Sequence, residues 1–176
     1  MTDTLDLSSL PLVAIPMDSL AALRAALARD LGGNAATYLH EAGYGGAGAI
    51  YDAFTKWLSA RGGPAPSELA LDDFAKAVGD FFAMSGWGTM GFSVADGGIA
   101  TIESSNWAES ADGAGSQLPC YFTSGILTDF FGRISDGAVS VLETECRSLG
   151  HERCKFLIGS PEKLQQVYEQ LYGSAG

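Results

Sequence analysis

The chain has 176 residues, of which 47% are hydrophobic and 18% are charged. This length and composition predict one globular domain with a single hydrophobic core, and they argue against a disordered chain. Ten basic and 21 acidic side chains give a net charge of −11 at pH 7. Because this charge repels nucleic-acid backbones and anionic lipid surfaces, we expect no direct nucleic-acid partner.

We interpret residues 1–17 as an extended lead-in that precedes a single domain at residues 18–176. Pro11 and Pro16 punctuate its apolar stretch, so the lead-in is expected to add an edge strand or to cross to a partner subunit. It has no cationic export signal, and no segment of the chain reaches about 18 uninterrupted apolar residues. We therefore expect a soluble, cytoplasmic protein without a membrane span.

Helical periodicity in the first half of the chain predicts three helices. The first begins at Asp18 or Ser19, either of which can cap it. Arg24 and Arg29 lie off the core-facing side of this first helix. Its core-facing positions are leucines at helical spacing: Leu20, Leu23, Leu27 and Leu31. The third helix covers LDDFAKAVGDFFAM.

The second helical region covers residues 34–63 and contains the glycine-rich sequence GYGGAG at residues 43–48. Glycine destabilises a helix interior by about 1 kcal/mol relative to alanine, so helix propensity does not explain why this segment is rich in glycine. A phosphate-binding loop would need a preceding buried strand and a following Lys-Ser/Thr, and the sequence has neither. We therefore predict that another backbone or a ligand approaches this segment closely.

In the second half the apolar residues alternate as in strands. The turn sequence DGG predicts a β-hairpin with arms near 88–95 and 98–105. Pro119 opens a helix that places Cys120 on its first turn. Two further strands, AVSVLETEC and CKFLIG, precede a last helix that is capped by Ser160.

All three cysteines, Cys120, Cys146 and Cys154, lie in this second half. An odd number of cysteines without an export signal argues against a disulfide framework and leaves the thiols available for a metal. Cys146 and Cys154 stand at the facing ends of two strands joined by a short loop. Three thiolates and one carboxylate form a complete ligand set for tetrahedral Zn²⁺.

The fourth ligand is open at this level of argument. Glu143 and Cys146 are three residues apart, so on a flat strand they would face opposite sides of the sheet. A bulge or a twist before Cys146 would bring them to one side. Otherwise Glu145, a water molecule or His151 completes the site.

Three segments, ETECRSLGHERCKF, PCYFTSGILTDFFG and GYGGAGAIYDAF, resemble the 4-vinyl-reductase domain family. That family includes sensor domains of phenol- and xylene-responsive transcription activators and a protein associated with bacteriochlorophyll synthesis. The resemblance covers about residues 20–172, and its most specific part is the pattern Glu-x-x-Cys-x7-Cys. It implies an α/β (α+β) fold in which helices pack on an antiparallel sheet, similar to subunits of the TRAPP membrane-transport complex.

The resemblance also implies a ligand set for the metal. In the aromatic-sensing members a structural zinc is bound at the positions that match Cys120, Glu143, Cys146 and Cys154. This implies that Glu143 rather than Glu145 is the fourth ligand. Because four protein ligands leave no open coordination position, such a zinc stabilises the fold and catalyses nothing, and we name no catalytic residue.

Function is then expected from a ligand pocket lined by aromatic side chains. Trp107 follows a hairpin arm in a polar segment and resembles the pocket tryptophan of the aromatic sensors. Tyr44, which lies among the glycines, Phe122 and Trp87 complete the candidate ligand contacts. The pocket histidine of the phenol sensors has no clear match, which favours an apolar or planar ligand.

We interpret the chain as a stand-alone, zinc-stabilised sensor or carrier domain for a small hydrophobic or aromatic molecule. We expect this domain to form a homodimer and to signal through a separate partner. The alternative is an enzyme or accessory protein in the reduction of a tetrapyrrole vinyl group, which would bind a pigment. The sequence has no dinucleotide fingerprint and no clear acid/base pair, which favours the binding module. A purely structural assembly subunit is the third possibility.

Overall fold

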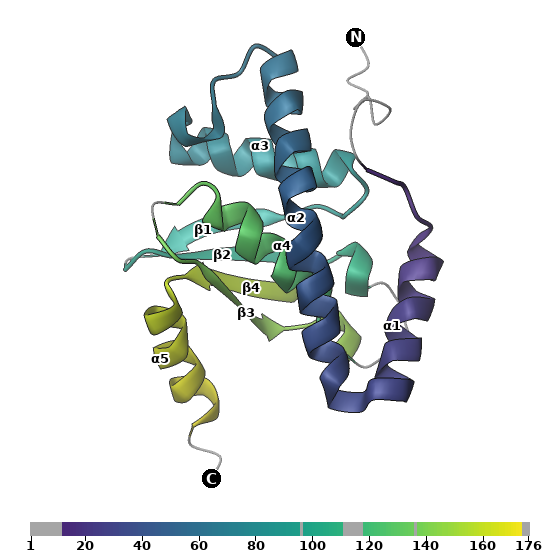
Figure 1. The fold of residues 1–176 in the computed structure, drawn as a ribbon. Helices are drawn as coiled ribbons and strands as arrows, with labels where there is room; N and C mark the ends of the chain where they lie inside the picture. The colour runs from purple at the N-terminus through teal and green to yellow at the C-terminus, as the bar shows by residue number, and fades with distance from the viewer. Residues whose placement is uncertain (1–11, 96, 111–117, 136, 174–176) are drawn as a thin grey trace.

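The computed structural model describes residues 12–95, 97–110, 118–135 and 137–173. These residues form five α-helices and four β-strands (Figure 1). In chain order the elements are α1 Met17–Leu31, α2 Ala35–Ala60, α3 Leu71–Met84, β1 Gly91–Ala95, β2 Ile99–Ser104, α4 Tyr121–Gly132, β3 Ser140–Glu145, β4 Cys154–Gly159 and α5 Pro161–Tyr172. A short 3₁₀ turn, η4, covers Ala108–Ser110.

The four strands form one antiparallel sheet in the order β1-β2-β4-β3. β1 and β2 form the predicted hairpin, whose turn uses Gly97 and Gly98 with φ of 97° and 74°. Positive φ favours glycine, which explains why the turn sequence signals the hairpin. β4 lies between β2 and β3, so the strands that lead to Cys146 and from Cys154 are neighbours.

α4 and α2 pack in layers on one face of this sheet (Figure 1). α4 lies against the sheet, and the long helix α2 crosses in front of α4 (Figure 1). The core between them is built from large apolar side chains such as Phe54, Phe130 and Phe156, all fully buried. The predicted fold, helices packed on an antiparallel sheet, is confirmed.

Glycines allow α2 and α4 to approach closely. A Cβ atom at Gly43 would lie 2.0 Å from the main-chain oxygen of Phe122, and one at Gly125 would lie 2.1 Å from that of His40. No side chain fits at either place, because the opposing atoms belong to backbone. The close approach predicted for the glycine-rich segment is therefore a helix-to-helix contact inside a continuous α2.

The orientation of α1 differs from the prediction. Its buried side chain is Arg24, whereas Leu23 and Leu31 are 52% and 37% exposed. The leucine pattern assumed that α1 faces an apolar core. Instead, the inner side of α1 meets polar main-chain groups that an arginine can satisfy.

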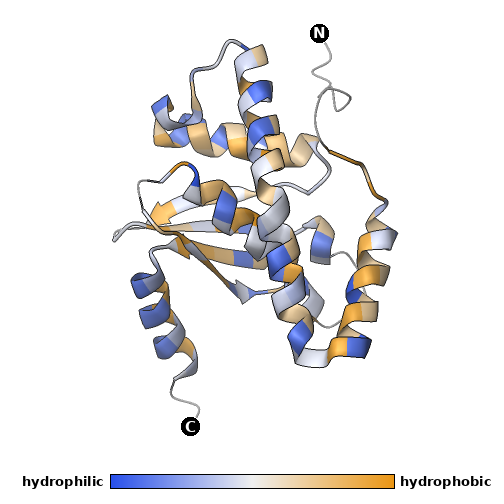
Figure 2. Cartoon of the chain, in the orientation of Figure 1, coloured by the Kyte–Doolittle hydropathy of each residue, from blue (hydrophilic) through white to orange (hydrophobic). Residues whose placement is uncertain are grey.

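The described part of the lead-in, residues 12–16, bears on only one of its two predicted roles, the edge strand. Residues 12–16 form no strand, although Leu12 packs against the core. Pro16 is the N-cap of α1 and provides no side-chain hydrogen bond, so neither Asp18 nor Ser19 caps this helix. Most of the predicted lead-in, residues 1–11, lies outside the described residues. Figure 2 shows the described lead-in as a hydrophobic segment that leads to α1.

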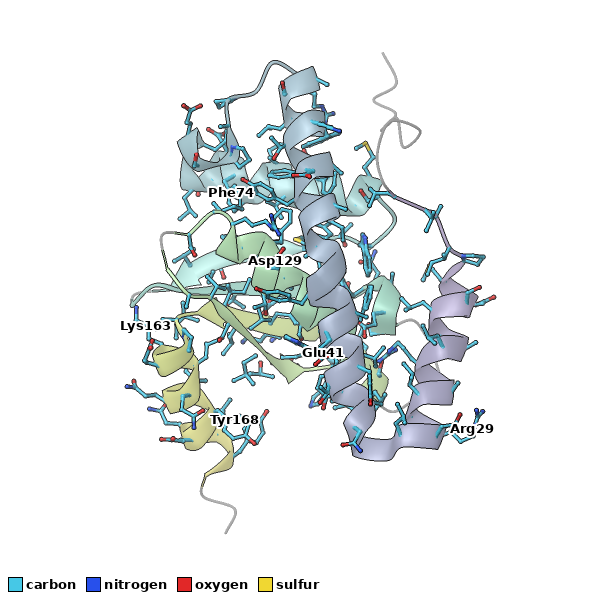
Figure 3. The ribbon with its side chains drawn as sticks, in the orientation of Figure 1. Arg29, Glu41, Phe74, Asp129, Lys163 and Tyr168 are labelled. Atoms are coloured by element: carbon cyan, nitrogen blue, oxygen red, sulfur yellow. The ribbon has the colours of Figure 1, made fainter. Side chains whose placement is uncertain are left out.

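The last helix starts as predicted. The Ser160 side chain accepts a hydrogen bond from the main-chain N–H of Lys163, and Pro161 occupies the first turn. Leu164 is buried, while Tyr168 is exposed near the C-terminal end of α5 (Figure 3).

Within the described part of the chain, no helix combines the length and apolar content needed to cross a membrane.

The α2–α4 contact can be tested with two alanine substitutions on the same helix. Gly43→Ala should lower the free energy of unfolding by roughly 1–3 kcal/mol, because its methyl group overlaps backbone atoms of α4. Gly45→Ala should raise it by up to about 1 kcal/mol, because a Cβ atom there meets nothing within 4 Å and alanine favours the helix. Urea denaturation measures both. Equal stability of the two variants would contradict the packing described here.

Candidate metal centre and adjoining pocket

Four side chains from the start of α4, from β3, from the loop after it and from β4 converge on one point. One ligand atom from each of Cys120, Glu143, Cys146 and Cys154 lies within 4.8 Å of the others. The Cys120 sulfur is 3.6 Å from that of Cys146 and 3.8 Å from that of Cys154. Sulfurs that share a tetrahedral zinc lie about 3.8 Å apart, since each Zn–S bond is about 2.3 Å. These distances fit a shared metal ion and are too long for a disulfide, whose S–S bond is about 2.05 Å.

A β-bulge brings Glu143 to the cysteines. Glu143 pairs with Phe156 on β4, whereas Glu145 pairs with the adjacent Lys155, so β3 holds one extra residue between the two glutamates. An extra residue reverses the alternation of side chains along a strand. Glu143 and Cys146 therefore face the same side of the sheet despite being three residues apart.

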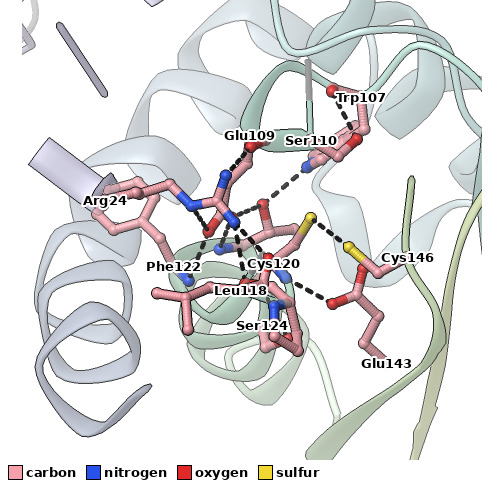
Figure 4. Close-up of polar contacts among 12 residues, drawn as sticks. Arg24, Trp107, Glu109, Ser110, Leu118, Cys120, Phe122, Ser124, Glu143 and Cys146 are labelled. Atoms are coloured by element: carbon pink, nitrogen blue, oxygen red, sulfur yellow. Dashed lines mark hydrogen bonds and ion pairs between the residues drawn. The ribbon is translucent and has the colours of Figure 1, made fainter. Parts of the chain in front are cut away.

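Glu143 has one oxygen that is ready for a cation. Its Oε2 atom accepts a hydrogen bond of 2.6 Å from the main-chain N–H of Cys120, as Figure 4 shows. Its Oε1 atom is buried and has no hydrogen-bond partner among the described residues. A buried carboxylate oxygen without a partner is costly, and a metal ion would satisfy it.

The pKa values of three of the clustered side chains also favour a metal site. Burial, with the neighbouring Cys146, raises the pKa of Glu143 to about 9. Hydrogen bonds to Cys146 and Cys154, together with burial, raise the pKa of the Cys120 thiol. Hydrogen bonds to Cys120 and Cys146 lower the pKa of Cys154 to about 4. At neutral pH Glu143 and Cys120 therefore keep protons that a cation would displace, while Cys154 is already a thiolate, the form that binds a metal.

The two alternative ligands are engaged elsewhere. The Glu145 carboxylate forms an ion pair with Arg153, with 3.1 Å between Oε2 and Nε. The Nδ1 atom of His151 lies 3.1 Å from the main-chain nitrogen of Cys146 and 3.0 Å from its oxygen. Neither side chain joins the cluster of four potential ligand atoms.

A second carboxylate, absent from the sequence prediction, binds the same end of α4. Glu109 accepts hydrogen bonds from the main-chain N–H groups of Phe122, at 3.2 Å, and Thr123, at 2.7 Å. It also accepts one of 2.6 Å from the Thr123 hydroxyl and forms a buried ion pair with Arg24 (Figure 4). Burial raises the pKa of Glu109, against the opposing effect of Arg24. No local sequence signal marks this pair, because its members belong to distant segments.

Beside this end of α4 lies a cavity of about 360 Å³. Its walls come from the lead-in, from the glycine-rich face of α2, from the segment after α3 and from the first turns of α4. Its lining is mostly apolar and contains no ionisable side chain among the described residues. The lining residues are Val13, Ala14, Ile15, Pro16, Met17, Leu20, Gly43, Gly46, Ile50, Ser85, Gly86, Trp87, Ala108, Phe122 and Ile126.

The structure brings two of the four candidate ligand contacts into this cavity. Trp87 and Phe122 line it, with their rings stacked at a centroid distance of 6.1 Å. Tyr44 is 49% exposed on α2 and is not part of the lining. Trp107 is only 1% exposed and stacks behind Trp87 at 5.8 Å. Its indole N–H donates to the Thr123 hydroxyl at 2.7 Å.

The polar neighbours of Trp107 explain why its burial was not predicted. Asn106 is exposed, whereas Ser110, on the other side of Trp107, is buried, and both form hydrogen bonds within the folded segment. The Asn106 side-chain oxygen accepts from the main-chain N–H of Thr89 at 2.9 Å, and the Ser110 hydroxyl donates to the main-chain oxygen of Trp107 at 3.0 Å. The lead-in, which forms one wall of the cavity, was also missed, because an extended segment carries no periodic signal.

Comparison with known proteins confirms the predicted resemblance. The family model of the 4-vinyl-reductase domain matches residues 99–160, a segment that contains all four candidate metal ligands. No curated protein sequence matches the chain significantly.

Similar solved structures share the fold at low sequence identity. The phenol-responsive sensory domain of the transcription activator PoxR, solved with phenol, has a TM-score of 0.65 and 17% identity, covering 91% of this chain and 82% of that one. Subunit 3 of a trafficking protein particle complex from Naegleria fowleri, covalently bound to palmitic acid, has a TM-score of 0.61 and 14% identity, covering 81% and 90%. A vinyl-4-reductase family protein from Methanocaldococcus jannaschii has a TM-score of 0.48 and 17% identity, covering 85% and 83%.

The choice between the two glutamates can be tested by paired substitutions. Glu143→Gln should weaken Zn²⁺ binding by more than about tenfold, because it removes the charged ligand and keeps the side-chain volume. Glu145→Gln should leave Zn²⁺ binding unchanged, since this carboxylate faces Arg153. Competition with a chromogenic chelator gives both affinities. A larger loss for Glu145→Gln would assign the fourth ligand to Glu145 instead.

Proposed function

We propose that this chain is a sensor or carrier domain that binds a small hydrophobic or aromatic molecule in the cavity beside α4. The observation that carries the proposal is the apolar cavity itself, whose wall includes Trp87 and Phe122. Its volume of about 360 Å³ falls in the range of small-molecule sites, about 300–1,000 Å³.

The chemistry of the lining supports binding rather than catalysis. Proton transfer needs an ionisable side chain within reach of the substrate, and the described lining has none. The Ser85 hydroxyl donates to the main-chain oxygen of Phe81 at 2.8 Å, so it is already engaged. The expected ligand is an aromatic or aliphatic molecule with at most one polar group.

The similar structures support the same class of ligand. The PoxR domain was solved with phenol, and the trafficking-complex subunit carries covalently bound palmitic acid. In the present chain all three cysteines belong to the candidate metal cluster, so we propose that the ligand binds without a covalent bond.

We further propose that the metal is Zn²⁺ and that its role is structural. Thiolate ligands select zinc among common divalent ions, and four protein ligands leave no position for a substrate. When bound, the ion would offset half of the four negative charges carried by the three thiolates and the Glu143 carboxylate. Cys120, Cys146 and Cys154 would then hold the start of α4 against the strands.

The homodimer and the separate signalling partner remain part of this proposal. Val13, Ile15 and Met17 are exposed apolar side chains of the lead-in and the start of α1, which is compatible with a protein contact there. Light scattering with mass determination would test the dimer.

The described cavity lining does not favour the tetrapyrrole alternative, since it contains no acid or base.

Native mass spectrometry of the purified protein, with and without a chelator, is the first test of the function. We expect one Zn²⁺ per chain. Titration with phenol, 2-naphthol, naphthalene and palmitate, followed by tryptophan fluorescence, then measures ligand preference. Binding of none of these probes would contradict the proposed ligand class, and a co-purified pigment would favour the tetrapyrrole alternative.

The location of the ligand can be tested by filling the cavity. Gly46 lines it, and a Cβ atom at this position meets nothing within 4 Å. Gly46→Leu should therefore fold normally while its side chain occupies the ligand space, and 2-naphthol binding should weaken by more than about tenfold. Gly45→Leu is the matched control, because Gly45 is equally open but lies outside the lining. Equal affinity in both variants would place the ligand elsewhere.

A further inference from the structure

The geometry points to Arg24 and Glu109 as a positioning pair that couples ligand occupancy of the cavity to the geometry of the metal cluster. This inference rests on the proposed function and extends it. It predicts that the two sites are energetically linked, and that the link passes through the first turn of α4.

The pair is unusual because both charges are withdrawn from water. The side chains of Arg24 and Glu109 are both fully buried, with 3.3 Å between Nε and Oε1. Arg24 also donates to the main-chain oxygens of Glu109, Leu118 and Pro119, at 2.7 Å and 3.1 Å for the last two. A buried ion pair is weak evidence for stability, since apolar residues of similar volume often stabilise as well. Its dense hydrogen bonding favours a role in fixing one arrangement of the surrounding segments.

The arrangement that it fixes is the start of α4. Glu109 accepts from the main-chain N–H groups of Phe122 and Thr123, while Glu143 accepts from that of Cys120. Two carboxylates on different elements therefore hold consecutive parts of one helical turn. The N-terminal end of a helix favours such negative charges because its N–H groups lack partners within the helix.

The same turn belongs to both sites. Phe122 lines the cavity, and Cys120, two residues earlier, belongs to the metal cluster. Arg24 and Glu109 also lie close to residues of two other cavity walls. Ala108 is next to Glu109 and lines the cavity, as does Leu20, one helical turn before Arg24. A ligand that displaces Phe122 or Ala108 therefore acts on the turn that positions the Cys120 sulfur.

The expected coupling follows from this shared turn. A ligand that favours one position of the turn should strengthen metal binding, and by thermodynamic reciprocity the metal should strengthen ligand binding by the same factor. Couplings of this kind commonly amount to about 5- to 150-fold in affinity. We expect at least about fivefold here.

The test uses the full chain loaded with Co²⁺ or Zn²⁺, with 2-naphthol as the cavity probe. In the wild-type protein, saturating 2-naphthol should shift the visible absorption bands of Co²⁺ and tighten Zn²⁺ binding at least fivefold, measured by chelator competition. In the double variant Arg24→Met/Glu109→Gln the band shift should disappear, and 2-naphthol should change the Zn²⁺ affinity by less than about twofold. This double variant leaves no uncompensated buried charge, so we expect it to fold.

Two further variants complete the design. Arg29→Met/Asp30→Asn removes an exposed ion pair from the same helix and should keep the wild-type coupling. Figure 3 shows Arg29 on the outer side of α1. Arg24→Lys keeps the charge but cannot serve all of the acceptors at once, so its coupling should fall at least twofold. It replaces the double variant in the test if that variant fails to fold.

The outcomes separate the inference from the proposed function. If 2-naphthol changes the Zn²⁺ affinity of the wild-type protein by a factor near one, the inference is overturned. It is also overturned if the double variant keeps the wild-type coupling factor, because the coupling would then not depend on Arg24 and Glu109. If 2-naphthol binds no form of the protein, the proposed ligand class fails instead. The Co²⁺ bands without ligand then decide: a shift between wild type and the double variant supports the positioning role, and identical bands overturn it. If the wild-type chain binds neither metal, the proposed zinc site and the coupling are both overturned.

Discussion

The structure depends on how the N-terminal end of α4 is held. This end presents main-chain N–H groups without helical partners, and two carboxylates from separate elements accept them. Glu143 reaches Cys120 from β3, and Glu109 reaches Phe122 and Thr123 from η4. Because a helix N-terminus attracts negative charge, both contacts are favourable. They fix the position of the one cysteine that lies outside the β3–β4 hairpin, and with it one wall of the cavity.

The opposite side of α4 is fixed by the absence of side chains. Gly43 and Gly125 let α2 lie directly on α4, with backbone against backbone. Gly46, about one turn later on α2, faces open space instead and lines the cavity. Gly43 thus permits a helix contact, and Gly46 leaves room for a ligand. The glycine-rich sequence, which disfavours a helix by propensity, is explained by both uses.

Much of the fold and of the candidate metal cluster could be predicted because the signals are local. The DGG turn fixes the hairpin through glycines at positive φ, and the Ser-Pro sequence fixes the start of α5. The cysteines and the Glu-x-x-Cys spacing predicted the cluster, provided that a bulge reversed the alternation of β3. The cavity could not be predicted in the same way, since its walls come from separate segments of the chain. Trp107, in a polar stretch, gave no sign of its burial.

The failure of the leucine pattern in α1 has a specific physical cause. Apolar periodicity predicts the buried face of a helix only where the helix meets an apolar surface. α1 instead meets main-chain oxygens of Glu109, Leu118 and Pro119, which need donors once they are removed from water. A guanidinium group supplies several donors in a fixed plane, so Arg24 satisfies them together and also neutralises the Glu109 carboxylate. The need to pair buried oxygens, rather than hydrophobic burial, therefore sets the rotation of α1, and the rotation of α1 places Leu20 in the wall of the cavity.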